Sequence, residues 1–239
     1  IYSGFGFVEL LSKLGIERRL HTAGDKKSLL DPFGPEKPAD IARVKALQKD
    51  WMGRSEGALI TFPVDGNEGL VIDTFTTRPD TIFGVTFVTL APENKLCEQL
   101  VSGSEYEEDW KQLREETSSM SDVDRSKLKE KKGVFLGRYA INPLNNEKIP
   151  IYAGNFVIAS YGTGSVMAVP GHDQRDFEFA KRYDIPITRV LLKEAGDEPD
   201  APIHGAFEGY GPMINSSRDN FDGLAGEEAK KAVITELER

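Results

Sequence analysis

Short apolar runs alternate with turns between residues 58 and 192, and this alternation constrains the fold more than any other feature of the chain. The runs are rich in β-branched and aromatic residues and are bounded by glycine, asparagine, aspartate or proline, which is the pattern of strands. The predicted strands are residues 58–64, 70–75, 85–90, 134–141, 149–152, 156–159, 165–169 and 187–192. The sequence therefore predicts a core built from strands.

Helical periodicity appears between and beyond these runs. It predicts helices at residues 92–101, 105–116, 173–183 and 226–237, with two short helices before residue 54. Residues 118–132 are dense in charge and are predicted to be a surface excursion, and residues 195–222 an extended connection. The mixture predicts an α+β chain in three parts: a helical N-terminal appendage at residues 1–48, a core with peripheral helices at residues 49–194, and an extended segment with a final helix at residues 195–239.

Composition limits the classes of function. The chain has 239 residues and is 39% hydrophobic, which suffices for a packed core. No apolar stretch approaches the roughly 20 residues that span a bilayer. A formal charge of −9 argues against nucleic-acid binding through a basic surface. Cys97 is the only cysteine, which excludes an internal disulfide and fits a reducing compartment, so we expect a soluble cytoplasmic protein with no membrane partner.

Polar side chains gather at the ends of two predicted strands. Residues 76–81 follow the strand that ends at Phe75, and residues 171–179 follow the strand that ends at Val169. Together they supply hydroxyls, a guanidinium and carboxylates, which a fold can bring together. We interpret these stretches as the two halves of one small-molecule site that hydrolyses an ester.

Each stretch also has a purely local interpretation. In residues 76–81 a threonine caps a turn, Pro79 fixes its φ, and Asp80 satisfies backbone donors at a helix start. Asp173 can act as an N-cap, and Asp176 as a first-turn acid favoured by the helix dipole. A carboxylate at Asp176 can instead bind a protonated amine. The residues alone leave both interpretations open.

Three other chemistries find little support. His172 beside Asp173 suggests a metal phosphohydrolase, but the chain has only 3 histidines and the other two are not spaced as ligands. Residues 162–164 lack the remaining elements of a phosphate-binding loop. No GxSxG elbow is present, and Cys97 lies in an apolar helix typical of a core, so a hydrolase built on this chain would use water directly.

Three motifs closely resemble those of one family. They are Trp51-Met52-Gly53-Arg54-Ser55-Glu56-Gly57, Thr76-Thr77-Arg78-Pro79-Asp80-Thr81-Ile82-Phe83-Gly84, and Tyr161-Gly162-Thr163-Gly164 through Asp176-Phe177-Glu178-Phe179-Ala180. In this order they resemble the inserted editing domain, connective polypeptide 1, of bacterial-type leucyl-tRNA synthetase. The resemblance runs from about residue 45 to the C-terminus. Residues 213–216 and 221–224 resemble the part by which that domain returns to the synthetic core, so we call residues 195–239 the return segment.

The resemblance implies a β-barrel-like domain that hydrolyses the aminoacyl ester of mischarged tRNA(Leu) with a positioned water. It implies no metal, no cofactor and no leucine activation. Thr76, Thr77 and Asp176 would be catalytic, with Asp176 binding the α-amino group, and Thr81 would be the steric gate that excludes the leucyl group. The implied substrate-binding set also contains Arg78, Asp80, Tyr161, Met167, Val169, His172 and Asp173. The implied partners are the 3′ end of tRNA(Leu) carrying a non-cognate amino acid, and the rest of a synthetase.

Residues 1–48 depart from that family. Gly4-Phe5-Gly6-Phe7, Thr22-Ala23-Gly24-Asp25-Lys26-Lys27 and Leu30-Asp31-Pro32-Phe33 resemble a fragment of signal-peptide-peptidase-type Ser/Lys proteases, with Lys27 at the general-base position. The serine-bearing region of those proteases is missing, so we expect no peptidase activity. For the whole chain, the alternative to an ester hydrolase is a non-catalytic module that binds the tRNA 3′ end or adenosine.

Overall fold

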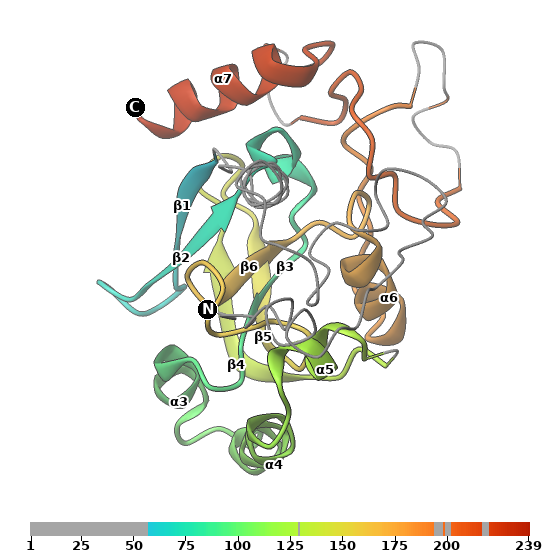
Figure 1. The fold of residues 1–239 in the computed structure, drawn as a ribbon. Helices are drawn as coiled ribbons and strands as arrows, with labels where there is room; N and C mark the ends of the chain where they lie inside the picture. Colours follow the sequence, from blue (N-terminus) through green and yellow to red (C-terminus); the bar gives the residue numbers. More distant parts are fainter. Residues whose placement is uncertain (1–56, 129, 194–197, 199–201, 217–219) are drawn as a thin grey trace, which may run out of the picture. The chain divides into compact units, whose positions relative to one another are not determined.

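A computed structural model describes residues 57–128, 130–193, 198, 202–216 and 220–239 (Figure 1). These residues belong to one compact unit. The predicted N-terminal appendage at residues 1–48 and its two short helices lie outside the described residues.

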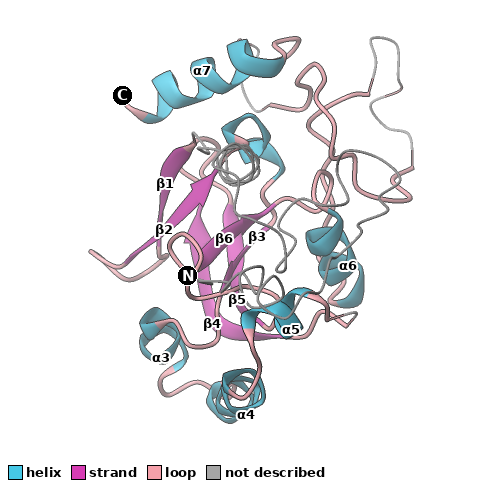
Figure 2. Ribbon diagram, viewed as in Figure 1, coloured by secondary structure: helices cyan, strands magenta, loops and turns pink. Residues whose placement is uncertain are grey.

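Six strands form two sheets (Figure 2). β1 (Ala58–Pro63) and β2 (Val71–Thr76) make an antiparallel pair. The second sheet has the order β4 (Gly133–Ile141), β5 (Lys148–Gly154), β3 (Phe87–Leu90) and β6 (Ser165–Ala168). In it β3 runs parallel to β5, whereas the β4–β5 and β3–β6 pairs are antiparallel.

The α+β class is confirmed, and the described strands approach a barrel without closing one. β1 is followed by Val64, which forms an isolated bridge to Ala140 of β4. At the other edge, the Ser165 hydroxyl of β6 donates to the Asp73 carbonyl of β2. The first junction has one further hydrogen bond, from the Asp65 N–H to the Tyr139 carbonyl at 2.8 Å. Neither junction extends into a ladder, so the strands remain two sheets.

Helices cover the sheets at several edges. The described helices are α3 (Lys95–Val101), α4 (Glu107–Ser118), α5 (Asp122–Ser126), α6 (Gln174–Arg182), α7 (Gly226–Leu237) and the 3₁₀ helix η1 (Pro79–Gly84). α3 and α4 lie against β4, and α7 lies against η1 (Figure 1). The helix predicted from residue 92 begins at Lys95, because the Asn94 side chain accepts the Leu96 N–H at 3.0 Å and acts as the N-cap.

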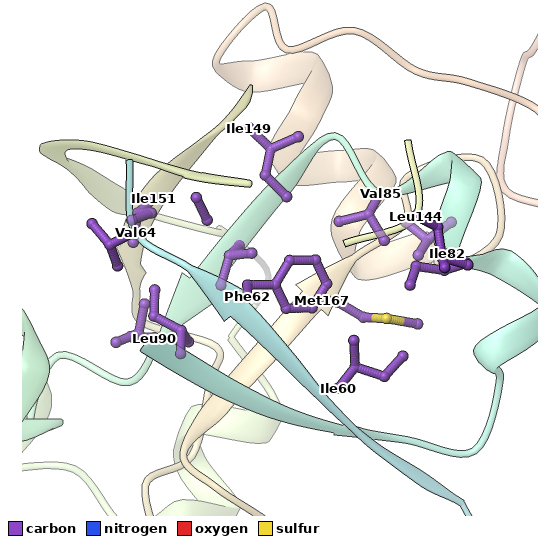
Figure 3. Packing of buried hydrophobic residues seen from close by; sticks show 14 of the residues in the cluster. Ile60, Phe62, Val64, Ile82, Val85, Leu90, Leu144, Ile149, Ile151 and Met167 are labelled. Atoms are coloured by element: carbon purple, nitrogen blue, oxygen red, sulfur yellow. The ribbon is translucent and has the colours of Figure 1, made fainter. Parts of the chain in front are cut away.

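The main core fills the space between the two sheets. Figure 3 shows Ile60 and Phe62 of β1 facing Met167 of β6, with Leu90 and Ile151 from the larger sheet nearby. A second cluster joins α6 to the sheet, where the Phe179 ring stacks on Phe87 with centroids 5.0 Å apart. The two clusters fix the position of α6 and of the turn that precedes it.

Two predicted strands are wrong. Residues 156–159 form a turn, and residues 187–192 run extended with only a bridge from Leu191 to Met213. Both segments are apolar because they are buried, but the N–H groups of Val190 and Leu191 donate to a histidine side chain rather than to a neighbouring strand. These two segments therefore have the apolar composition of a strand because they are buried, but they do not form a ladder of backbone hydrogen bonds.

The predicted surface excursion at residues 118–132 is also only partly correct. It contains α5, and the Arg125 side chain from that helix is buried. Its guanidinium donates to the carbonyls of Asn155 and Val157 and to the Glu93 carboxylate. The density of charge predicted that residues 118–132 are exposed. The buried Arg125 instead links α5 to the segments that contain Glu93 and Asn155.

Candidate functional site

The threonine-rich stretch forms a tight turn from β2 into η1. The Thr76 hydroxyl accepts the Arg78 N–H at 3.0 Å, and Pro79 opens η1. The Arg78 carbonyl accepts both the Thr81 N–H at 3.1 Å and the Thr81 hydroxyl at 2.9 Å. Thr81 is buried and Thr77 is exposed. The local prediction is thus correct for Thr76 and Pro79 and wrong for Asp80, whose carboxylate pairs with the Arg78 guanidinium instead of capping η1. The turn also presents Thr77 on the surface.

Arg78, which is partly exposed, forms an ion pair with the buried Asp80 beside this turn. The Arg78 Nε donates to both Asp80 carboxylate oxygens at 3.1 and 3.2 Å, and its Nη2 donates to Oδ2 at 2.9 Å. The remaining guanidinium donors reach the carbonyls of Glu208 at 3.5 Å and Gly209 at 3.2 Å. Both side chains implied as substrate-binding are therefore engaged with the protein itself.

The second half of the site is the turn from β6 into α6. Asp173 is the N-cap of α6 and accepts the N–H groups of Arg175 at 2.8 Å and Asp176 at 3.2 Å. The Arg175 guanidinium pairs with the same carboxylate at 3.0 Å. Asp173 is thus placed to fix the start of the helix that carries Asp176.

Asp176 lies in the first turn of α6 and is only 4% exposed. Its Oδ2 accepts the Val169 N–H at 2.9 Å, and Oδ1 accepts no hydrogen bond within the described part of the chain. Burial, reinforced by the negative charge of Asp173, raises the pKa of Asp176 to about 8, although the Val169 hydrogen bond and Arg175 act in the opposite direction. At neutral pH this carboxyl group is therefore mostly protonated, and a cationic partner would favour its ionised form.

His172 is buried with both ring nitrogens engaged. Its Nδ1 lies 2.9 Å from the Phe207 carbonyl, while Nε2 lies 3.0 and 3.1 Å from the N–H groups of Val190 and Leu191. These partners require a neutral ring that donates from Nδ1 and accepts at Nε2. Burial lowers the pKa of His172, which favours the same neutral form. The imidazole is therefore placed to join backbone segments and has no ring nitrogen left for a ligand.

The structure brings the two halves together. A Cβ added at Gly84, the end of η1, would lie only 3.2 Å from the Val169 side chain. The backbone at Gly171 packs even more tightly against its surroundings, because a Cβ added there would lie 2.5 Å from the Thr188 carbonyl. Only glycine permits this approach at the turn before α6. The end of η1 and the turn before α6 are therefore neighbours in the fold, and the joint site of the threonines and Asp176 stays a prediction.

The other residues implied for the pocket occupy two environments. Met167 and Val169 are buried in the main core, where Figure 3 shows Met167 beside Phe62. Tyr161 is 73% exposed in the loop between β5 and β6. That loop lies near β2, since a Cβ added at Gly162 would lie 3.8 Å from Phe75. These positions surround the threonine-rich turn, and the roles of the three side chains stay predictions.

Sequence reasoning missed one part of the site. Residues 206–210, predicted only as extended connection, contact both halves, through Phe207 on one side and through Glu208, Gly209 and Tyr210 on the other. The one signal in the sequence is a pair of aromatic residues within a glycine-rich stretch. No local pattern could reveal partners more than a hundred positions earlier in the chain.

Two further candidates from the sequence can be placed. Among the described residues, no group of three or more histidine, cysteine, aspartate or glutamate side chains is arranged to hold a metal ion. Cys97 is buried on α3, and desolvation raises the pKa of its thiol to about 12, as expected of a core cysteine. No described helix is both long and apolar enough to cross a membrane.

Comparison with known proteins gives a consistent result. A family model described as the editing domain of leucyl-tRNA synthetase matches residues 49–238. A leucine–tRNA ligase of Nitratidesulfovibrio vulgaris is 48% identical over 198 residues, and one of Clostridium beijerinckii is 46% identical over 198 residues. Each alignment covers 82% of this chain and 23% of the relative, so the chain matches about a quarter of those enzymes.

A solved structure agrees with the sequence matches. The crystal structure of Agrobacterium radiobacter leucyl-tRNA synthetase in a ternary complex with tRNA and LeuAMS superposes with a TM-score of 0.54 at 35% identity. The superposed region covers 68% of this chain and 20% of the synthetase chain. The matched region contains both strand ends of the candidate site. This chain therefore belongs to the family of the leucyl-tRNA synthetase editing domain.

Proposed function

We propose that the chain hydrolyses the ester that links a non-cognate amino acid to the 3′ end of tRNA(Leu). Membership of the editing-domain family supports a role in tRNA editing. The observation that carries the specific reaction is the buried Asp176 carboxylate, which is held at Oδ2 by the Val169 N–H while Oδ1 has no hydrogen bond within the described chain. A buried carboxylate with an available oxygen suits the α-ammonium group of an aminoacyl ester.

The threonine-rich turn supplies the remaining chemistry in this proposal. In it, the hydroxyls of Thr76, which accepts the Arg78 N–H, and of the exposed Thr77 orient the attacking water or donate to the oxyanion that develops on the ester carbonyl. An ester is already reactive, so positioning and oxyanion stabilisation can supply the acceleration without a metal or a cofactor.

Thr81 suits the role of a steric gate. Its hydroxyl is fixed by the Arg78 carbonyl, and the side chain is buried, so the methyl group becomes a rigid surface. Discrimination of one methylene in an apolar pocket is worth only about 1–3 kcal/mol, so an accurate synthetase benefits from a second site with the opposite size rule. A fixed wall that rejects the larger leucyl group gives that rule.

The proposed partners are tRNA(Leu) and the remainder of a synthetase. The chain aligns with only 23% of the length of the leucine–tRNA ligases described above. Its formal charge of −9 gives it no general affinity for phosphates. Delivery of the 3′ end therefore depends on basic surfaces outside this chain. The cytoplasmic location expected from the single cysteine stays a prediction.

The test is deacylation of norvalyl-tRNA(Leu) and isoleucyl-tRNA(Leu) by the purified chain, with leucyl-tRNA(Leu) as the comparison. Asp176→Asn should lower kcat/KM roughly 10- to 150-fold, because a charge-assisted hydrogen bond is worth about 1.5–3 kcal/mol. Asp109→Asn, at an exposed first-turn position of α4, is the matched control and should have no effect.

The gate is tested in the same assay. Thr81→Ala should allow hydrolysis of leucyl-tRNA(Leu), whereas Thr117→Ala, which also removes a buried hydroxyl that donates to a carbonyl, should not. A folded chain with no rate above the buffer blank contradicts the proposal. If such a chain still binds the tRNA 3′ end in a parallel titration, the alternative of a non-catalytic binding module gains support.

A further inference from the structure

Residues 206–210 of the return segment, which we call the strap, contact both halves of the site. Backbone carbonyl and N–H groups of the strap make five of the six hydrogen bonds described below, the Glu208 carboxylate makes the sixth, and the Tyr210 ring adds a stacked contact. The strap begins 24 residues after the end of α6 at Arg182, and Glu208 lies 130 positions after Arg78 in the threonine-rich turn. These distant pairings need an explanation beyond a surface connection.

On the side of α6, four hydrogen bonds anchor the strap. The His172 ring donates to the Phe207 carbonyl at 2.9 Å, and the Phe207 N–H donates to the Gly171 carbonyl at 2.9 Å. The Gln174 side-chain carbonyl accepts the Ala206 N–H at 3.3 Å, and the Glu208 carboxylate accepts the Gln174 N–H at 3.2 Å. The strap thereby supplies an acceptor for one of the orphan N–H groups at the start of α6.

On the side of the threonine-rich turn, one side chain receives the strap. The Arg78 guanidinium donates to the carbonyls of Glu208 and Gly209, and its Cζ lies 4.2 Å from the centroid of the Tyr210 ring. Asp80 holds the other edge of the same guanidinium. Lys230 of α7 lies 5.0 Å from the Tyr210 centroid and adds a second cation beside the ring.

The contact passes directly to the proposed gate. The backbone carbonyl of Arg78 accepts both the N–H and the hydroxyl of Thr81, so a displaced Arg78 displaces Thr81. On the opposite side, Gly171 and His172 directly precede Asp173, the N-cap of the helix that carries Asp176. The strap thus contacts Arg78, which holds Thr81, and Gly171 and His172, which precede the N-cap of α6.

We propose that the strap sets the relative position of the two halves, and that Arg78 and Tyr210 are positioning residues for the threonine-rich turn rather than ligands of the substrate. The inference rests on the proposed ester hydrolysis. Tyr210 is 60% exposed, so its removal takes little from the core while it frees one face of the guanidinium. A misplacement of about 1 Å at a reacting centre can cost about a hundredfold in rate.

The experiment compares kcat and KM for norvalyl-tRNA(Leu) in Tyr210→Ala, Tyr210→Phe and Arg78→Lys. A positioning role predicts that Tyr210→Ala lowers kcat about tenfold or more with KM within about twofold, and that Tyr210→Phe restores kcat because it keeps the ring. Arg78→Lys should resemble Tyr210→Ala, because an ammonium lacks the planar fork. Combining the two should cost little more than either alone.

Tyr139→Ala, an exposed aromatic on β4, is the matched control and should leave both constants unchanged. A raised KM with unchanged kcat in Tyr210→Ala would make Tyr210 a substrate ligand and overturn the inference. Unchanged kcat and KM would remove the strap from the site altogether.

A second readout separates this inference from the proposed function. Hydrogen exchange at the Thr81 amide, which donates to the Arg78 carbonyl, should accelerate about tenfold in Tyr210→Ala and not in Tyr210→Phe or Tyr139→Ala. If the unchanged chain shows no deacylation, the proposed function fails while this exchange still decides the role of the strap. Equal exchange in all variants would show that the strap does not hold the turn.

Discussion

At the scale of single residues, the environment of Asp176 is the most unusual in the described chain. Desolvation raises its pKa from the ordinary value of 3.8 to about 8. The native protein therefore holds a proton that the unfolded chain releases above pH 4. The stabilising contribution of this group is complete below pH about 4 and is lost as the pH rises through 8. Burial of the site's central carboxylate thus costs stability under the conditions in which it would bind an amine.

We predict a bell-shaped dependence of kcat/KM on pH with a maximum near pH 8. Below that value the free carboxyl is protonated, so forming the ion pair releases one proton and kcat/KM should rise about tenfold per pH unit. Above it the free α-amino group, with a pKa of about 7.7–8.0, loses its proton and the rate falls. Deacylation is measured from pH 6 to 9 with the spontaneous hydrolysis subtracted. A profile that stays flat between pH 6 and 7.5 would contradict this assignment.

The sequence predicted the local roles of single residues well and their distant roles poorly. Asp173 as N-cap and Pro79 at the start of a helical turn follow from nearest neighbours, and both are confirmed. Arg78 and His172 were implied as substrate-binding, but their donors and acceptors are taken by the strap and by Val190 and Leu191. Because those partners are set by the tertiary fold, spacing along the chain carried no information about them.

At the scale of elements, α5 depends on one buried ion pair. Arg125 is 4% exposed and pairs with Glu93 at 2.8 Å while it donates to two backbone carbonyls. It joins α5, the turn after β5 and the residues before α3. One buried guanidinium thus makes three of the contacts that fix this short charged helix to the body of the domain, and the Ser160 hydroxyl adds a hydrogen bond to the Asp122 carboxylate at 2.7 Å.

Arg125→Leu should lower the free energy of unfolding by about 3–5 kcal/mol, because it leaves the Glu93 carboxylate and two carbonyls without their donor. The measurement is the midpoint of urea unfolding at unchanged slope. Arg182→Ala, which breaks the exposed pair with Glu130, is the control and should leave the midpoint nearly unchanged. Equal shifts in the two variants would show that the buried pair does not stabilise the fold.

Strand prediction succeeded where a ladder exists and failed where burial alone exists. The six described strands, β1 to β6, all lie within two residues of their predicted bounds. Residues 156–159 and 187–192 are equally apolar, but they pack beneath α5 and against the return segment instead of pairing as strands. The apolar pattern reports burial, and only the pairing partner distinguishes a strand from a buried loop.

At the scale of the whole molecule, the return segment is part of the core. Phe221 is 1% exposed, and its ring lies 5.3 Å from that of Phe83 in η1. Ala229 and Val233 of α7 are buried in the same cluster. The sequence predicted the final helix correctly and treated the preceding residues only as connection, since their glycine and proline content hides the few buried side chains.

Phe221→Ala should lower the free energy of unfolding by about 3–5 kcal/mol and shift one cooperative transition as a whole. The reason is that the cavity opens between η1 and the return segment, in the same core that contains both sheets. Circular dichroism and tryptophan fluorescence should report the same midpoint. Leu59→Ala, at an exposed position of β1, serves as the control. A biphasic transition would show that the return segment unfolds on its own.

The long separation between the strap and the threonine-rich turn has a consequence for synthesis of the chain. The hydrogen bond from Arg78 to the Gly209 carbonyl joins residues 131 positions apart. During translation, the sheets and α6 emerge from the ribosome ahead of residue 209, so they can begin to associate while the site is still open on one side. Because it closes so long a loop, this contact carries a large loop-closure entropy. A nascent chain thus acquires its fold first and its finished site only afterwards.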